Sequence, residues 1–287
     1  MKIRERIVKI PSRVLDFVMP RLCLSCGEPV GYFESDAFCP ECAEKYRAML
    51  DAVCPKCGQS VRYCGCSPYR FRDFTVRGFA ALGFYFGFDD IVGQTVYRFK
   101  RTNDRDLREY FADALADEIR RRYPRNVTDA VIVYPPRSDK AKRRYGFDQS
   151  ALLAKKVASK LGCGCSDAIR RIGGAEQKRL NAAERAENAV TEFAIKDADA
   201  VLGRDVIVID DVSTTGSTMC AAARIVRDAG ARSVFPAVLF VTPGKRELPG
   251  SDGLWFEESD GIGLENTDDA SENAGFEQDF DGIDFGF

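Results

Sequence analysis

Residues 206–218, with the sequence VIVIDDVSTTGST, decide how the rest of this chain can be arranged. Four apolar β-forming residues precede two adjacent carboxylates, Asp210 and Asp211. This pattern is typical of a buried parallel strand that delivers charge at its C-terminal end. Open α/β sheets bind their ligands at that end of the strands. The stretch therefore predicts an α/β fold with a ligand site beside the two acids.

The segment after the acids is rich in hydroxyl groups and turns on one glycine, Gly216. An Ala-rich helix is expected from about Met219, so the backbone N–H groups of the turn would face an anion at the positive end of that helix. A Walker loop fits poorly because no lysine follows the glycine. The two acids would instead hold vicinal hydroxyls of a ribose whose 5-phosphate lies in the turn. A buried strand with an acidic turn of no function is the alternative.

Length and composition limit the class of protein. A chain of 287 residues with 45% hydrophobic content can bury one main core and carry an accessory piece. No apolar run approaches the roughly 20 residues of a membrane span. Residues 1–20 are basic and lack a secretion signal, so we expect an amphipathic helix and a cytoplasmic protein.

The charge is divided unevenly along the chain. Residues 247–287 hold 13 of the 44 acidic residues and none of the 42 basic ones, which leaves residues 1–246 with a net charge of +11. The positive net charge of residues 1–246 favours binding of a polyanionic partner. The chain has no histidine. Catalytic triads, general bases and metal sites that use histidine are therefore excluded.

Eight of the eleven cysteines fall between residues 23 and 66 in closely spaced pairs. Such knuckles are typical of structural zinc sites, in which four thiolates leave no open position for catalysis. Disulfides are the alternative and would need an oxidising compartment. Whether successive or alternate pairs share an ion stays open at this point. The predicted zinc ligands are Cys23, Cys26, Cys39, Cys42, Cys54, Cys57, Cys64 and Cys66.

Hydrophobic periodicity predicts the remaining elements. Between residues 138 and 149 we expect a mobile cationic loop that carries Arg143 and Arg144. A basic cluster at residues 98–105 stays open between a solvated face and a phosphate-binding role. The expected strands lie within 71–88, at 130–134, near 167–172 and at 234–241; the expected helices lie at 89–100, 104–123 and 150–161, before about 193, and at 217–229. The helix at 104–123 has an apolar stripe on one face, formed by Leu107, Phe111, Leu115 and Ile119. Pro236 in the last strand is compatible only with a sheet edge or a bulge.

The whole pattern resembles the ComF competence-protein family, in which cysteine knuckles precede a phosphoribosyltransferase domain. Asp148 stands where the family usually has Asn, and Tyr145 where it usually has Arg. The resemblance rests on the knuckles, on the stretch at 206–218, and on Arg98, Phe99, Pro135, Pro136, Arg144, Gly146, Phe147, Asp148, Gln149, Arg171, Gln177, Leu180, Arg185, Asn188 and Phe193.

The resemblance implies a type I phosphoribosyltransferase-like parallel sheet flanked by helices, with an N-terminal zinc-ribbon module. We expect four parts: an amphipathic helix at 1–20, a zinc-binding domain at 21–70, a phosphoribosyltransferase-like domain at 71–243, and a disordered acidic tail at 244–287. The tail ends in phenylalanines spaced among acids, and it would serve either solubility or docking on a basic pocket.

The implied ligand is phosphoribosyl pyrophosphate (PRPP) or ribose 5-phosphate, with Mg²⁺ if turnover occurs. The implied process is DNA uptake, with single-stranded DNA and helicase or recombination proteins as partners. The alternative is a non-catalytic DNA-binding module whose PRPP site is a sensor or a relic. The acceptor cannot be read from the sequence. The predicted catalytic residues are Asp210, Asp211, Arg143 and Arg144; the predicted binding residues are Val212, Ser213, Thr214, Thr215, Gly216, Ser217, Thr218, Pro136 and Arg137.

Overall fold

The computed structural model describes residues 21–30, 37–54, 57–61, 63–64, 79–86, 91–123, 125–172 and 193–242. All of them lie in the first of two units, Met1–Glu247. The predictions for residues 1–20, 65–78, 173–192 and 243–287 lie outside the described residues. No helix in the described ranges is long and apolar enough to cross a bilayer.

A five-stranded parallel sheet forms the centre, in the order β1-β7-β6-β2-β3. All nine residues of β7 are buried, as are the first five of β6, because both faces of the sheet are covered. The strands are β1 (Ala80–Phe84), β2 (Val131–Val133), β3 (Gly164–Cys165), β6 (Asp205–Ser213) and β7 (Ser233–Val241).

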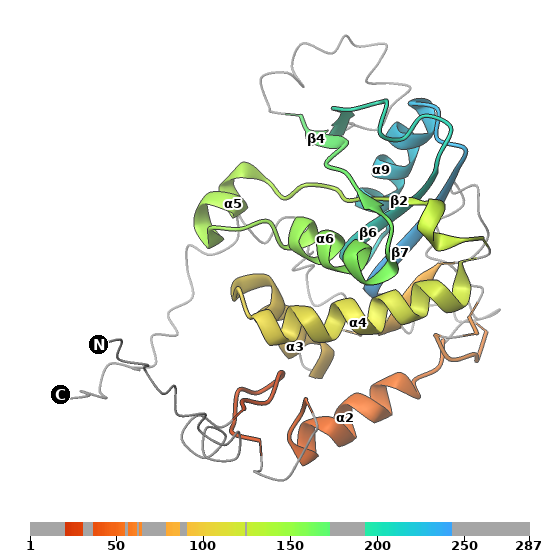
Figure 1. The fold of residues 1–287 in the computed structure, drawn as a ribbon. Helices are drawn as coiled ribbons and strands as arrows, with labels where there is room; N and C mark the ends of the chain where they lie inside the picture. The colour runs from red at the N-terminus through yellow and green to blue at the C-terminus, as the bar shows by residue number, and fades with distance from the viewer. Residues whose placement is uncertain are drawn as a thin grey trace, which may run out of the picture. The chain divides into compact units, whose positions relative to one another are not determined.

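Helices cover the sheet on both sides (Figure 1). Helix α4 packs against β1, β7 and α6, while α9 packs against β6 and β7. Asp104 starts α4 by accepting hydrogen bonds from the backbone N–H groups of Asp106 and Leu107. The main helices are α3 (Ile91–Arg101), α4 (Arg105–Arg122), α6 (Gln149–Leu161) and α9 (Ser217–Asp228).

The predicted apolar stripe of α4 is confirmed. Leu107, Phe111, Leu115 and Ile119 are fully buried, and Phe111 meets Phe240 of β7 edge to face at 5.7 Å. The parallel, helix-flanked sheet predicted from the sequence is thereby confirmed.

Smaller elements complete the described chain. Strands β4 (Ile169–Arg171) and β5 (Phe193–Ile195) form a separate antiparallel pair. The prediction of a helix ending near Phe193 is wrong at that residue, which lies in β5. The remaining elements are α2 (Pro40–Leu50), a 3-10 turn η2 (Val127–Asp129) and α5 (Asp139–Tyr145).

Three predictions about local structure need correction. The segment at 138–149 holds helix α5, because the Ser138 side chain caps its start and Gly146 takes the left-handed conformation at its end. Strand β6 does not stop at the acids, since its pairing with β7 continues to Ser213. Pro236 lies on an inner strand, but the described β1 pairing begins one residue later, at Ala237, so β7 is locally unpaired on that side.

Candidate functional site

The acid pair lies where β6 extends beyond its neighbour β2. The register pairs β2 with β6 only from Val131 to Val133, opposite Val206 to Val208. Asp210 and Asp211 therefore pass the end of β2 and reach the start of α6, where the Ser150 hydroxyl donates to Asp210 Oδ1 at 3.2 Å. Asp211 is 8% exposed. The two acids thus share one partly buried position at the C-terminal edge of the sheet.

The electrostatics of this pair are unfavourable to two full charges. Burial, and then the charge of Asp211, raise the pKa of Asp210 to about 7. The backbone N–H of Asp211 (2.9 Å), the Lys100 ammonium and the Ser150 hydroxyl act in the opposite direction. Asp210 therefore changes its charge near neutral pH.

Lys100, at the end of α3, is the cation closest to the pair among the described residues. Its Nζ lies 3.5 Å from Asp211 Oδ2. In the sequence, Lys100 is only one member of the basic cluster at residues 98–105, because the rotation of α3 about its axis decides which member of that cluster reaches β6. Its place in the last turn of an amphipathic helix was the only available signal.

The turn after the acids is shorter than predicted. Val212 and Ser213 are the last residues of β6, and α9 already begins at Ser217, so Thr214, Thr215 and Gly216 alone form the turn. Gly216 is buried and adopts a φ of 79°, which a residue with a side chain rarely takes.

Gly216 also occupies the N-cap position of α9 and offers no side chain to the N–H groups of the first turn. The Thr215 hydroxyl lies 2.7 Å from that of Ser217 and accepts from the Ser217 N–H at 3.3 Å. Thr215 and Ser217 are exposed and Thr218 is half-buried. The turn and the first residues of α9 thus present hydroxyl groups at the positive end of a helix.

A second polar segment follows β2. Pro136 is buried, while the Arg137 guanidinium donates to the Lys100 carbonyl at 3.2 Å and lies over the Tyr145 ring at 5.1 Å. The backbone N–H of Arg137 donates to Asp148 Oδ2 at 3.1 Å. The structure therefore brings Arg137 beside the segment that carries Lys100.

The two predicted flap arginines lie on α5. Both Arg143 and Arg144 are exposed, and Arg144 stacks over Tyr145 at 5.5 Å. Neither is ion-paired with the acids in the part of the chain that the structure describes. Asp148 holds α5 in place, because it caps α6 through the Ala151 N–H and pairs with Lys142 at 3.4 Å.

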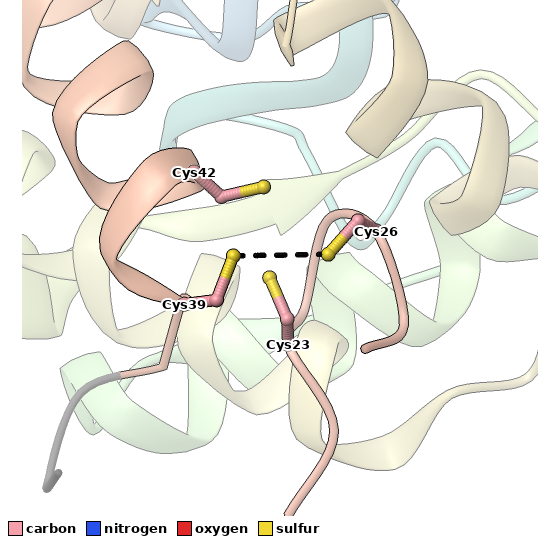
Figure 2. Close-up of side chains that lie close together, drawn as sticks. All are labelled: Cys23, Cys26, Cys39 and Cys42. Carbon is pink, nitrogen blue, oxygen red and sulfur yellow. Dashed lines mark hydrogen bonds between the residues drawn. The ribbon is translucent and has the colours of Figure 1, made fainter. Parts of the chain in front are cut away.

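The first four cysteines form one cluster (Figure 2). Cys23 and Cys26 lie on a turn, while Cys39 and Cys42 flank the start of α2. The four sulfur atoms lie within 4.8 Å of one another, and those of Cys26 and Cys39 are 3.8 Å apart. Tetrahedral Zn²⁺ with Zn–S bonds of about 2.3 Å requires sulfur atoms about 3.8 Å apart. The geometry fits a closed structural zinc site.

Two thiols of this cluster, those of Cys23 and Cys42, have pKa values far from the ordinary one. Burial opposes ionisation of Cys23, but N–H donors of Cys39, Cys26 and Ser25 outweigh it and lower the pKa of Cys23 to about 7. Burial and the neighbouring sulfur atoms raise the pKa of Cys42 to about 12. Four thiols at this distance cannot all ionise without a cation between them.

The second cluster repeats the first. Cys54, Cys57 and Cys64 gather together, with the sulfur atoms of Cys57 and Cys64 3.6 Å apart; Cys66 lies outside the described residues. In both knuckles, the first cysteine accepts from a glycine N–H, Gly27 or Gly58, whose φ is positive. Successive knuckles thus share a site, which settles the pairing that the sequence left open.

The remaining cysteines stand apart from these clusters. Cys163 and Cys165 flank the start of β3 and are half-buried, while Cys220 is buried in α9. Among the residues predicted through the family resemblance, Gln177, Leu180, Arg185 and Asn188 lie outside the described ranges. Arg171 donates to the Pro136 carbonyl at 3.4 Å.

Two family models match this chain. Residues 14–68 match the double zinc ribbon domain, and residues 148–258 match the phosphoribosyl transferase domain. The order of parts implied by the ComF resemblance is thereby confirmed.

Three curated relatives are similar to parts of this chain. The chain is 33% identical over 144 residues to the DNA utilization protein YhgH of Salmonella typhimurium, covering 48% of this chain and 62% of that protein. It is 34% identical over 137 residues to the adenine phosphoribosyltransferase of Rhodococcus jostii, covering 47% of this chain and 71% of that enzyme. Ribose-phosphate pyrophosphokinase 1 of Archaeoglobus fulgidus is 38% identical over 90 residues, which are 31% of this chain and 26% of that enzyme.

Proposed function

Because this chain belongs to the phosphoribosyltransferase family and carries a double zinc ribbon, we propose that it binds PRPP at the C-terminal end of β6. One observation carries the proposal: the acid pair, the Gly216 turn and the uncapped start of α9 follow one another on a single strand, turn and helix. Two of the relatives are named for acting on ribose phosphate or phosphoribosyl groups. Their shared chemistry supports a phosphorylated ribose as the ligand.

The roles of the residues follow from their chemistry. The carboxylates of Asp210 and Asp211 would accept hydrogen bonds from two ribose hydroxyls, which fixes the sugar and favours positive charge at C1′. The hydroxyls and N–H groups of residues 213–218 would donate to the 5-phosphate, where the helix dipole also favours an anion. Binding energy at the phosphate, far from C1′, would thus orient the reacting carbon.

As the bond from C1′ to the pyrophosphate oxygen breaks, negative charge develops on the leaving pyrophosphate and must be stabilised. The Arg137 guanidinium follows the neighbouring strand β2, and Arg143 and Arg144 lie on α5 near it in sequence. We assign these three arginines to the pyrophosphate, with α5 closing toward the ligand when it binds. Mg²⁺, if bound together with PRPP, would supply further positive charge beside the pyrophosphate, in addition to the three arginines.

Calorimetric titration with PRPP tests the binding step. We expect saturable binding at pH 8 with one site per chain. Release of pyrophosphate, followed by phosphorus NMR with adenine as a probe acceptor, tests turnover. Binding without release would leave a PRPP-responsive binding protein, and no binding in the presence of Mg²⁺ would refute the proposal.

A second candidate function is binding of single-stranded DNA during DNA uptake. Relatives named DNA utilization proteins support it, although the chain spans less than two thirds of their length. Tyr63, next to Cys64 of the second cysteine cluster, is 73% exposed, and Tyr97 is 47% exposed with the Arg101 guanidinium 4.1 Å above its ring. Exposed aromatic and arginine planes of this kind stack on unpaired bases. Helicase or recombination proteins as further partners remain predictions of the family resemblance.

Fluorescence anisotropy with a labelled oligonucleotide, repeated over a range of salt concentrations, tests this candidate. Bound phosphates release counterions, so the affinity should fall steeply as salt rises. Tyr97→Ala should weaken binding without changing the salt slope, since it removes a stacking surface and no charge. An affinity that does not depend on salt would contradict the candidate.

A further inference from the structure

Helix α3 is fastened to the first zinc knuckle by two polar contacts. The Arg98 guanidinium donates to the carbonyl of Cys23 at 2.7 Å, and it also pairs with Asp104 at 2.8 Å. The Thr95 hydroxyl meets that of Ser25 at 3.1 Å in a buried position. The turn of the knuckle also lies directly on the guanidinium, since a Cβ at Gly27 would be 3.4 Å from Arg98 Nη1.

The other end of the same helix segment reaches the acid pair. Lys100 lies two residues after Arg98, and its ammonium group is 3.5 Å from Asp211 Oδ2. Both side chains are largely buried, with 26% of Lys100 and 11% of Asp211 exposed. Phe99, between the two basic residues, is 1% exposed and packs edge to face on Phe111 of α4 at 5.2 Å. The segment therefore has little freedom to move Lys100 independently of Arg98.

The Lys100 ammonium offsets negative charge at the acid pair. Two adjacent carboxylates repel each other, and together they repel a ligand that carries several negative charges. The groups that face Asp210 are Asp211 on its own strand, Lys100 from α3 and the Ser150 hydroxyl from α6. Lys100 is the only cation among them, so it offsets part of the repulsion.

We infer that Lys100 is a further positioning residue of the phosphoribosyl site, held against Asp211 by the first zinc knuckle through Arg98 and α3. This inference rests on the proposed function. Lys100 holds the Asp211 carboxylate through their ion pair and orients it toward the sugar hydroxyls. The zinc knuckle then contributes to ligand binding without contacting the ligand.

Lys100→Met tests the first half of the inference, because it keeps the length of the side chain and removes its charge. We expect the Kd for PRPP to rise about tenfold, which corresponds to about 1.4 kcal/mol. The lower limb of the pH profile of binding should also move to higher pH, which a merely structural role would not cause. Lys156→Met is the matched control, since Lys156 pairs with Glu109 at 2.7 Å, away from the acids. Equal affinity in Lys100→Met and wild type would overturn the inference.

Arg98→Met tests the second half, because it removes the tie to the Cys23 carbonyl and leaves all zinc ligands intact. We expect weaker PRPP binding in this variant, and no further loss when it is combined with Lys100→Met. Such a cycle isolates the coupling between the two residues. Thr95→Val, which removes the hydroxyl contact with Ser25 together with the bond within α3 to the Ile91 carbonyl, serves as a second variant that leaves Arg98 in place. Additive losses would show that the knuckle acts by a route other than Lys100.

A measurement without ligand separates this inference from the proposed function. Failure of the wild type to bind PRPP would refute the function. The titration of the Asp210 carboxyl carbon, followed by NMR in wild type and in Lys100→Met, does not depend on PRPP. We expect its midpoint to rise in the variant. An unchanged midpoint would overturn the role of Lys100, whatever the result with PRPP.

Discussion

The two ends of strand β6 carry the same residue type in opposite electrostatic states. At the start, Asp205 is 2% exposed, and the Arg232 guanidinium donates to its two oxygens at 2.9 and 2.7 Å. Hydrogen bonds from Arg232, assisted by Ser233 and Arg125, overcome burial and lower the pKa of Asp205 to about 2. Near the other end, burial and Asp211 raise the pKa of Asp210 to about 7.

In the proposed function, the first end of β6 serves stability and the second end serves ligand binding. A buried carboxylate with a full set of hydrogen-bond donors stabilises the fold, whereas one with few donors can still accept hydrogen bonds from a ligand. Asp205 has its partners within the chain. Asp210 accepts from the Ser150 hydroxyl and the Asp211 N–H, while Asp211 accepts from the Val212 N–H and lies beside Lys100. In the proposed function, their remaining acceptor capacity serves the ribose. Variants at the two ends should therefore separate stability from binding.

The largest expected effect is on stability, at the first end. Asp205→Asn removes charge-assisted hydrogen bonds from a buried position and should lower the free energy of unfolding by about 2 kcal/mol at pH 7. Because the pKa of Asp205 is lowered, its contribution is complete above about pH 4 and disappears as the pH falls toward 2. Urea unfolding at pH 7 and pH 3 measures this. An equal loss at both pH values would contradict the assignment.

The next effect is the pH dependence of PRPP binding at the second end. Asp210 accepts a ribose hydroxyl fully only as a carboxylate, so affinity should fall below pH 7 by up to about tenfold per pH unit. The ligand's own phosphates also titrate in this range. The same titration with Asp210→Asn provides the correction, because only the wild type has the carboxyl group. If the affinity for PRPP changed with pH in the same way in both proteins, the titration of Asp210 would not be the cause of the pH dependence.

The smallest effect is a gain in stability. The raised pKa of Asp210 means that the fold favours the protonated acid, so stability declines as the pH rises from about 4 to 7. Asp210→Asn should therefore raise the free energy of unfolding by about 1 kcal/mol at pH 8 and change little at pH 4. Thermal unfolding at the two pH values measures this. If Asp210→Asn were less stable than wild type at pH 8, the Asp210 carboxylate would already be stabilised by groups within the chain.

Most of the fold follows from local patterns in the sequence. The apolar run before Asp210 predicts β6, and the stripe from Leu107 to Ile119 predicts the buried face of α4. The cysteine spacing predicts the two metal clusters, because each knuckle is a local turn. These features depend on neighbours within one turn or one strand, which is why the sequence alone suffices.

The parts that were missed depend on distant contacts. Helix α5 is stabilised by Asp148, whose side chain binds Lys142 and the Arg137 N–H. Lys100 reaches Asp211 from α3, and the same helix contacts the Cys23 carbonyl of the first knuckle through Arg98. The expectation of an edge position for Pro236 is wrong, because the sequence of a single strand does not indicate the order of strands in the sheet. Each error concerns a relation between elements rather than an element itself.

One measurement tests the central claim most directly: titration calorimetry with PRPP at pH 8 on wild type, Asp211→Asn and Asp205→Asn. Asp211 is 8% exposed and lies at the proposed sugar site, and its amide variant keeps the shape of the side chain while losing the charge. We predict that Asp211→Asn binds at least about tenfold more weakly with unchanged thermal stability, while Asp205→Asn binds like wild type. Equal binding by wild type and Asp211→Asn would contradict a phosphoribosyl site at this end of β6.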